Sequence, residues 1–183
     1  MRLEETCIPG ALIINNHAFK DDRGAFSRLF CSREFEEIIG QKTVVQINHS
    51  QTHRVGAIRG FHFQNIPNAE MKIVRCIKGR VFDVAVDLRQ ESPTFLKWTA
   101  VELTSESYTA FVIPEGCAHG FQVLEEDSEL LYLHTEYYSP DAEGGVRFDD
   151  PIIGVDWPLV ATDLSERDLR HPLLKQDFKG IVL

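Results

Sequence analysis

Two histidine-bearing segments contain the side chains best suited to acid–base chemistry. The first, IRGFHFQ, spans residues 58–64, and strand alternation predicts His62 on one face and Arg59 on the other. The second, PEGCAHGF, contains His119 just before a glycine. Between them, the alternation of EMKIVR places Lys72 on an apolar strand face, where a lysine is rarely buried without a function. These side chains offer two imidazoles and an ammonium group to any site that the fold builds from them.

A structural role remains the more frequent one for any single histidine. The glycines around His119 also suit a simple turn. The combination of His62, His119 and Lys72, and no member taken alone, therefore indicates a site. A structural role is expected for the remaining histidines, which are His17, His49, His53, His134 and His171.

Short β-rich runs separated by turn residues make up most of the chain. Strands are predicted over 43–50, 72–77, 81–88, 97–103, 109–114 and 128–135. Gly79 suits a tight hairpin between the second and third of these strands. In 81–88 the apolar residues share one face while Asp83 and Asp87 occupy the other, which predicts a half-buried strand of an antiparallel sheet.

Two short helices are predicted beside the strands. The first is capped by Ser32 and ends at Gly40, and the second follows Asp163 and stops before Pro172. Many short strands without βαβ alternation predict a mainly β fold, a jelly-roll barrel with short peripheral helices. The length of 183 residues fits one domain, residues 1–183, which would hold a ligand between its sheets.

Composition narrows the partners that the chain is expected to have. Its 19 basic and 28 acidic side chains give a net charge of -9, which argues against nucleic-acid binding. The N-terminal run MRLEETCIPGALII fits neither a signal peptide nor a membrane span, so no membrane association is expected. The four cysteines form no CxxC pair, and the simplest expectation is a cytoplasmic protein in a reducing compartment.

A jelly roll with histidines also resembles the metal-binding cupins. Such a site needs an H-x-H pair, a carboxylate and a later histidine. Here Gln64 replaces the second histidine of the pair, no carboxylate is obviously placed to complete the set, and Lys72 would repel a cation. No metal and no other cofactor is therefore expected.

The stretch from 21 to 157 resembles the dTDP-4-dehydrorhamnose 3,5-epimerase family, a cupin-fold group that acts on nucleotide sugars. The matching blocks occur in order and cover most of the chain. They are DDRGAFS, QINHS, IRGFHFQ, KIVRCIKGRVFDVAVDLRQESPTF, PEGCAHGF, ELLYLHTEYYSP and DDPIIGVDWP.

The resemblance implies catalytic roles for five residues. His62 would be the general base, oriented by Asp168, and Tyr132 would be the acid on the opposite face of the sugar. Lys72 would stabilise the enolate oxygen, with His119 beside it. This chemistry requires a base near neutral pKa and a positive group at the developing oxyanion, because a C–H bond beside a ketone is acidic only through its enolate.

The resemblance also implies a substrate-binding set. Arg59 and Gln46 would hold the diphosphate, whereas Arg23 and Phe26 would reach nucleotide bound in the partner subunit of a homodimer. The other expected substrate-binding residues are Arg28, Tyr138 and Glu143.

Several positions depart from the family pattern. Glu70 stands where the family usually has glutamine, Cys117 replaces a phenylalanine, and Phe148 replaces a tryptophan. Arg28 stands where the family carries a glutamate that recognises the thymine ring. Because an arginine supplies only hydrogen-bond donors and cytosine offers acceptors, Arg28 favours cytidine over thymidine unless it points to solvent or to a phosphate.

The sequence therefore predicts an epimerase of a nucleoside-diphosphate 4-keto-6-deoxyhexose. It would invert C3, or C3 and C5, of a dTDP- or CDP-linked sugar. The alternatives are a sugar ketoisomerase of the same fold and a non-catalytic sugar-nucleotide-binding cupin. Both His62 and Tyr132 are present, which argues against the second alternative because binding alone needs neither a base nor an acid.

Overall fold

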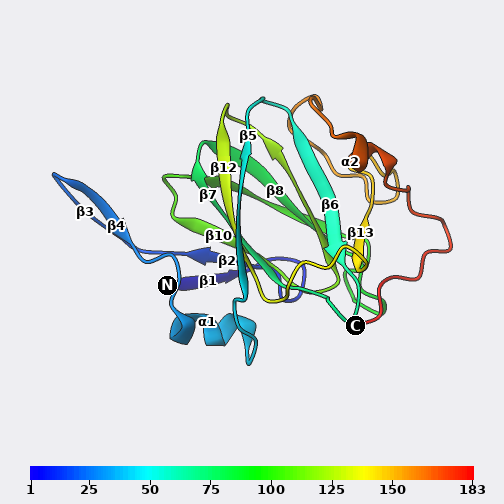
Figure 1. The fold of residues 1–183 in the computed structure, drawn as a ribbon, viewed down its shortest axis with the longest axis horizontal. Coiled ribbons are helices and arrows are strands. Elements are labelled where there is room, and N and C mark those ends of the chain that lie inside the picture. Colours follow the sequence, from blue (N-terminus) through cyan, green and yellow to red (C-terminus); the bar gives the residue numbers. More distant parts are fainter.

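Two antiparallel β-sheets face each other in the computed structural model, which describes residues 1–183 (Figure 1). The six-stranded sheet has the order β1 (Arg2–Glu5), β2 (Leu12–Asn15), β10 (Thr109–Ile113), β7 (Lys72–Lys78), β12 (Ser128–His134) and β5 (Gln46–Thr52). The five-stranded sheet has the order β13 (Glu143–Gly145), β6 (Ile58–Gln64), β11 (Cys117–Val123), β8 (Arg80–Asp87) and β9 (Trp98–Thr104). The predicted mainly β jelly-roll fold is confirmed.

Each of the six strands predicted from alternation overlaps an observed strand, but two details were wrong. Gly79 does not close a hairpin, since β7 and β8 lie in different sheets and the chain crosses between the sheets at this residue. Its φ of 75° suits the sharp turn, and a Cβ there would lie 2.4 Å from Ser128 Oγ. The segment around His119, where a turn was the alternative, is the strand β11.

The β8 strand is buried on both faces, which corrects the prediction of a half-buried strand. Val81 and Ala85 belong to the core between the sheets, and Asp83 lies fully buried on that same side. Val84 and Val86 pack on the outer face, where the C-terminal third of the chain covers the sheet. The covering segment is distant in the sequence and has little regular structure. The alternation within 81–88 therefore could not predict that the outer face is covered.

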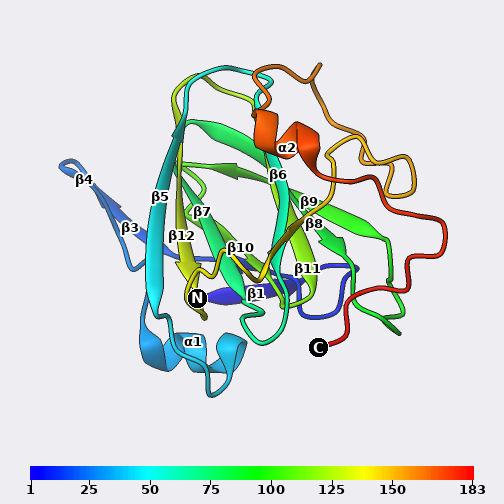
Figure 2. The same ribbon diagram turned by 45° about the vertical axis from the view of Figure 1, so that its right-hand side comes forward.

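Two short helices lie at the periphery, as predicted. The helix α1 (Ser32–Ile39) is capped at Cys31 without a side-chain hydrogen bond, so the predicted cap at Ser32 was wrong by one residue. It packs Phe35 and Ile39 against the six-stranded sheet and ends at Gly40. The helix α2 (Glu166–Arg170) lies beside β6 (Figure 2). No helix is long and apolar enough to cross a membrane.

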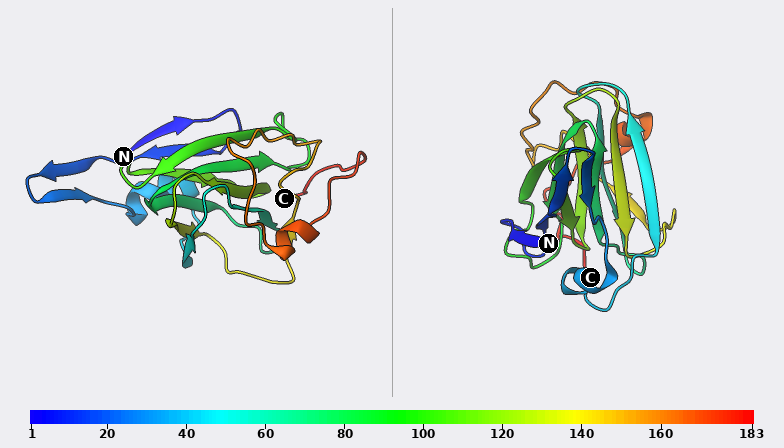
Figure 3. Two further views of the ribbon diagram at one scale, coloured as in Figure 1. Left: turned by 90° about the horizontal axis from the view of Figure 1, so that it is seen from above. Right: turned by 90° about the vertical axis from the view of Figure 1, so that its left-hand side faces the viewer.

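A two-stranded hairpin projects away from the body of the sandwich. It consists of β3 (Ala18–Asp21) and β4 (Gly24–Ser27), and the views in Figures 1 and 3 show it standing clear of both sheets. Phe19 and Phe26 on this hairpin are 68% and 71% exposed. Two exposed phenylalanines on a small ribbon indicate a surface that is suited to further contacts.

Candidate active site

A cavity of about 550 Å³ opens between the two sheets. Strands β5, β7 and β12 form one wall, and β6 and β11 form the other. The cavity brings together six of the predicted site residues, namely Arg59, His62, Lys72, His119, Tyr132 and Glu143.

The β6 strand contains an irregularity that places Arg59 and His62 on the same side. Opposite β11, Arg59 pairs with Phe121 and His62 with His119, while the register shifts at Gly120 and leaves Phe61 as an extra residue. Such a bulge reverses the alternation and re-aims the side chains. The prediction that Arg59 and His62 occupy opposite faces was therefore wrong.

Close backbone approach makes this bulge possible. Gly60 has a φ of 124°, and a Cβ on it would lie 2.5 Å from the Cα of Gly120. Only glycine fits there without displacing the neighbouring strand. The extra residue, Phe61, turns outward and stacks on Trp157 with ring centroids 5.6 Å apart.

His62 forms a dyad with Asp168, which α2 supplies. Nε2 of His62 lies 2.7 Å from Oδ1 of Asp168, and the other carboxylate oxygen accepts a bond from the Gly60 N–H at 3.3 Å. Burial acts to raise the pKa of Asp168, but these hydrogen bonds outweigh it and hold the pKa below its usual value. An ionised Asp168 requires a proton on Nε2, so Nδ1 of His62 is the nitrogen that can accept a proton.

Tyr132 stands on the opposite wall, on β12 of the other sheet. Its hydroxyl lies 3.0 Å from the Ser50 hydroxyl. Burial raises the pKa of Tyr132 well above its ordinary value, so the phenol stays protonated at neutral pH. A base on one wall and a protonated phenol on the other can exchange protons with two faces of a bound sugar.

Lys72 forms an ion pair with the carboxylate of Glu70, a residue that was expected only to depart from the family pattern. Its Nζ lies 3.2 Å from Oε1 of Glu70, and Nδ1 of His134 lies 2.6 Å from Oε2 of the same group. Burial acts to raise the pKa of Glu70, yet the bond from His134 and the charge of Lys72 keep it lowered. The result is a charged carboxylate that holds an ammonium group at the cavity wall.

His119 also pairs with a buried carboxylate. Its Nε2 lies 2.7 Å from Oδ1 of Asp83, which is fully buried on the neighbouring strand β8. Burial raises the pKa of Asp83 more than its contact with His119 lowers it. Alternation had placed Asp83 on the exposed face of a half-buried strand, so this pair was not predicted.

Four predicted substrate-binding residues line the cavity or bond to residues close to it, which are Arg59, Glu143, Tyr138 and Gln46. The Arg59 guanidinium bonds to Thr52 and to the Gln51 carbonyl, which fixes it on the wall. Glu143 lines the cavity and accepts a bond from the Tyr138 hydroxyl at 3.3 Å. The remaining member, Gln46, lies on β5 of the six-stranded sheet, and its side-chain oxygen accepts the Tyr138 backbone N–H at 3.2 Å.

Three other predicted site residues do not line this cavity in the single chain. Arg23 and Phe26 lie on the projecting hairpin, where the Arg23 side chain is 90% exposed and bonds to Asp21. Arg28 pairs with Glu34 of α1, with Nη1 and Oε1 2.6 Å apart. Its guanidinium already has an acceptor in this arrangement.

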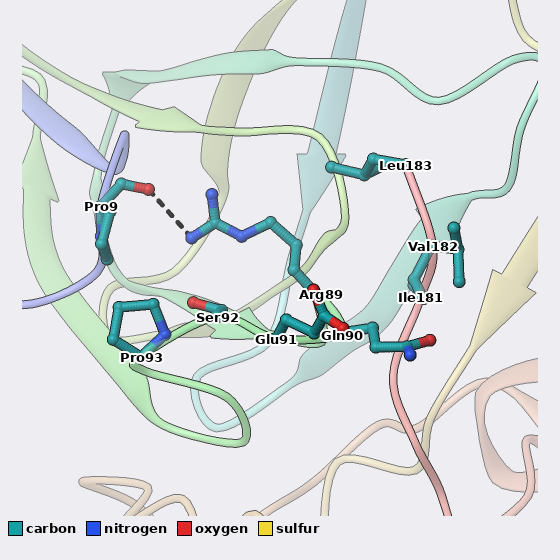
Figure 4. Close-up of a pocket in the computed structure, with 9 residues that line it drawn as sticks. All are labelled: Pro9, Arg89, Gln90, Glu91, Ser92, Pro93, Ile181, Val182 and Leu183. Atoms are coloured by element: carbon teal, nitrogen blue, oxygen red, sulfur yellow. Dashed lines mark hydrogen bonds between the residues drawn. The ribbon is translucent and has the colours of Figure 1, made fainter.

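A second cavity, of about 440 Å³, lies beside the C-terminus (Figure 4). Arg89 reaches into it, but its Nε and Nη2 atoms bond to Asp87, and Nη2 also bonds to the Pro9 carbonyl. No histidine lines it. The acid–base groups therefore assign the active site to the cavity between the sheets.

Comparison with known proteins agrees with this geometry. Residues 5–176 match the family model described as dTDP-4-dehydrorhamnose 3,5-epimerase. The chain belongs to the dTDP-4-dehydrorhamnose 3,5-epimerase family. A curated relative of that name from Salmonella typhimurium is 48% identical over 174 residues, which cover 94% of each chain.

Solved structures of this epimerase family share the fold. The epimerase from Legionella pneumophila, in complex with dTDP-4-keto-L-rhamnose, superposes with a TM-score of 0.89 at 38% identity, covering 94% of this chain and 92% of that one. A 3'-monoepimerase from Streptomyces bikiniensis, in complex with dTDP-quinovose, gives 0.85 at 35% identity, covering 91% and 85%. The chain is a sugar-nucleotide epimerase of the cupin fold.

Proposed function

We propose that this epimerase inverts carbon centres beside the ketone of a dTDP-linked 4-keto-6-deoxyhexose. The observation that carries the proposal is the His62–Asp168 dyad on one wall, with Tyr132 on the other. Such an arrangement serves an inversion, which needs a base and an acid on opposite faces of the reacting carbon.

The reaction follows from the groups at the cavity walls. Nδ1 of His62 takes the proton from the carbon beside the ketone, and Asp168 stabilises the imidazolium that forms. The electron pair moves onto the carbonyl oxygen, where the Lys72 ammonium stabilises the enolate. Tyr132 then donates its proton to the other face of the same carbon, and solvent restores the phenol and the neutral imidazole.

The nucleotide is proposed as dTDP rather than CDP. The Arg28–Glu34 pair supplies the support, since a guanidinium paired with Glu34 of α1 is engaged away from a cytosine edge. The relatives from Legionella and Streptomyces described above both hold dTDP sugars. The names of relatives include both 3,5-epimerases and a 3'-monoepimerase, so either C3 alone or C3 and C5 are inverted.

A homodimer is proposed to complete the site. The hairpin presents Arg23 and the exposed Phe26 away from its own cavity, which suits delivery of both residues to nucleotide bound by a second copy. Mixing two inactive variants tests whether each chain completes the site of its partner. If His62→Asn and Arg23→Ala chains mix at random, half of the dimers are mixed and one site in each is intact, so about a quarter of the activity returns. If no activity returned, the proposal that the hairpin completes the partner's site would be contradicted.

Two further expectations accompany the proposal. Residues 1–183 are proposed to act as a single domain. A cytoplasmic location is proposed because the cysteines Cys7, Cys31, Cys76 and Cys117 are all free.

The experiment for the reaction is solvent exchange. The protein is incubated in deuterated water with a dTDP-4-keto-6-deoxyhexose, and NMR locates the incorporated deuterium. Deuterium at C3, or at C3 and C5, together with inversion supports the proposal. Conversion to a 3-keto sugar would instead indicate a ketoisomerase, and binding without exchange would indicate a binding protein.

A further inference from the structure

His171, for which a structural role was expected, lies against the His62–Asp168 dyad. Its ring is 5.5 Å from that of His62, in an edge-to-face arrangement. Its Nε2 atom lies 3.8 Å from Oδ1 of Asp168, which is too far for a hydrogen bond. That nitrogen is buried and has no hydrogen-bond partner. An unpartnered buried nitrogen beside a carboxylate indicates a place for a ligand.

Three potential ligand atoms converge at this place. One each from His62, Asp168 and His171 lie within 4.8 Å of one another. The missing Cβ of Gly145 makes room for the third residue, because a Cβ there would lie 2.3 Å from the ring carbon Cε1 of His171. The backbone pairing of Gly145 with His62 sets the two imidazoles side by side.

Two imidazoles and one carboxylate match the preferences of a specific class of cation. Zn²⁺ and its neighbours in the first transition series bind this set, whereas Mg²⁺ and Ca²⁺ prefer oxygen ligands. With metal–ligand bonds of about 2.0–2.2 Å, tetrahedral ligand atoms lie about 3.3 Å apart. Side-chain movements on the order of 1 Å would therefore close these atoms around an ion. The Gly60 N–H already orients the carboxylate through its second oxygen.

We propose that His62, Asp168 and His171 form a binding site for Zn²⁺ or a similar divalent transition-metal ion, whose occupancy switches the epimerase off. This site differs from that of the metal-binding cupins, because two of its three ligands come from the C-terminal segment. The ion acts as an inhibitor and has no part in the reaction. The inhibitory part of the proposal rests on the proposed function of His62 as the base.

The inhibition follows from the two nitrogens of His62. In the free enzyme Nε2 carries a proton toward Asp168, and Nδ1 has the lone pair that accepts the substrate proton. An ion bound at Nε2 takes the lone pair of that nitrogen, so the proton of the neutral ring moves to Nδ1. The base is then lost, while the diphosphate-binding residues on the cavity wall keep their places. Zinc should accordingly lower kcat and leave nucleotide affinity unchanged.

The first measurement is zinc binding, which does not depend on activity. Metal-free protein competes with a chromophoric chelator for Zn²⁺, and the expected result is one site per chain that a hundredfold excess of Mg²⁺ does not displace. His171→Ala should weaken binding at least 10-fold, and His171→Phe should do the same while keeping the ring volume. His53→Ala, which removes a histidine from the exposed pair with Asp127, is the matched control and should leave this site unchanged. Absence of binding by the wild type, or unchanged affinity in both His171 variants, would overturn the site.

The second measurement is the effect of zinc on solvent exchange by the same proteins. The wild type should lose at least 90% of kcat at saturating zinc, whereas His171→Phe, compared with its own zinc-free rate, should lose little. Zinc bound through His171 without any loss of kcat would overturn the switch. A protein that binds zinc in this way but shows no exchange even without metal would contradict the proposed function instead, so the two failures are distinguishable.

Discussion

Nε2 of His119 lies 2.7 Å from Asp83, the same distance that separates Nε2 of His62 from Asp168. The two pairs sit in different surroundings, since Asp83 is enclosed between the sheets whereas Asp168 comes from a helix at the edge of the sandwich. We therefore expect the first pair to matter for stability and the second for catalysis.

Removal of the Asp83 carboxylate should destabilise the protein. Asp83→Ala leaves the buried His119 without its partner, which costs about 1–3 kcal/mol in the free energy of unfolding. Asp83→Asn keeps an acceptor oxygen and should cost less. Urea unfolding of both variants checks this, with Asp127→Ala, from the exposed pair with His53, as a control that changes little. Equal stability of wild type and Asp83→Ala would show that His119 finds another partner.

The Glu70 carboxylate should be replaceable by an amide but not by an apolar group. Glu70→Leu leaves the Lys72 ammonium and the His134 imidazole without their acceptor, and loss of one partner of a buried pair costs about 3–5 kcal/mol. Glu70→Gln retains an oxygen for one of them and should lose markedly less. Chemical denaturation at neutral pH measures both. A Glu70→Leu protein as stable as Glu70→Gln would mean that solvent takes over the role of the carboxylate.

Asp87 should contribute stability that disappears in acid. Burial acts to raise its pKa, but hydrogen bonds from Arg89, Ser92 and Thr94 together lower the pKa from 3.8 to about 2. A pKa that is depressed by folding stabilises the native state above about pH 4, and this stabilisation is lost as the pH falls toward 2.

Asp87→Asn removes this contribution. Its free energy of unfolding at pH 6 should be lower than that of wild type by about 2 kcal/mol, and the difference should narrow between pH 4 and pH 3. Urea titrations across this range measure it, and Asp141→Asn, at an exposed position, is the control. A difference that is constant with pH would mean that packing, rather than charge, explains the loss.

The identity of the nucleotide is open to direct titration. The proposed dTDP-linked substrate implies that dTDP binds more tightly than CDP, and the Arg28–Glu34 pair implies that Arg28 does not contribute to this preference. Calorimetry with the two nucleotides side by side measures this, and Arg28→Ala should leave the ratio of affinities unchanged. Tighter binding of CDP that depends on Arg28 would show that the arginine leaves Glu34 to read the base.

The sequence allowed the fold and much of the site to be predicted, for reasons that particular residues illustrate. Alternation located the main strands. His62, Lys72 and Tyr132 lie in sequence blocks that resemble those of the epimerase family. Alternation failed at Arg59, because a bulge is set by the contact between Gly60 and a glycine on the next strand.

Residues whose surroundings come from distant parts of the chain were missed for a related reason. Asp83 was placed on an exposed face, because burial of that face depends on contacts between distant segments. The carboxylate of Glu70 and the ring of His171 acquire their roles from residues far away along the chain, which are His134 and His62 respectively. No local pattern marks such pairings, and only the packing of the sheets and the C-terminal segment creates them.

The central claim is that His62 removes the proton and Tyr132 returns one on the other face, and isotope exchange tests it most directly. Wild type, His62→Asn and Tyr132→Phe are incubated in deuterated water with a dTDP-4-keto-6-deoxyhexose, and calorimetry confirms that each still binds dTDP. NMR should show exchange with inversion in wild type, no exchange in His62→Asn, and exchange with retained configuration in Tyr132→Phe. Substantial exchange in His62→Asn, or normal inversion by Tyr132→Phe, would contradict the account.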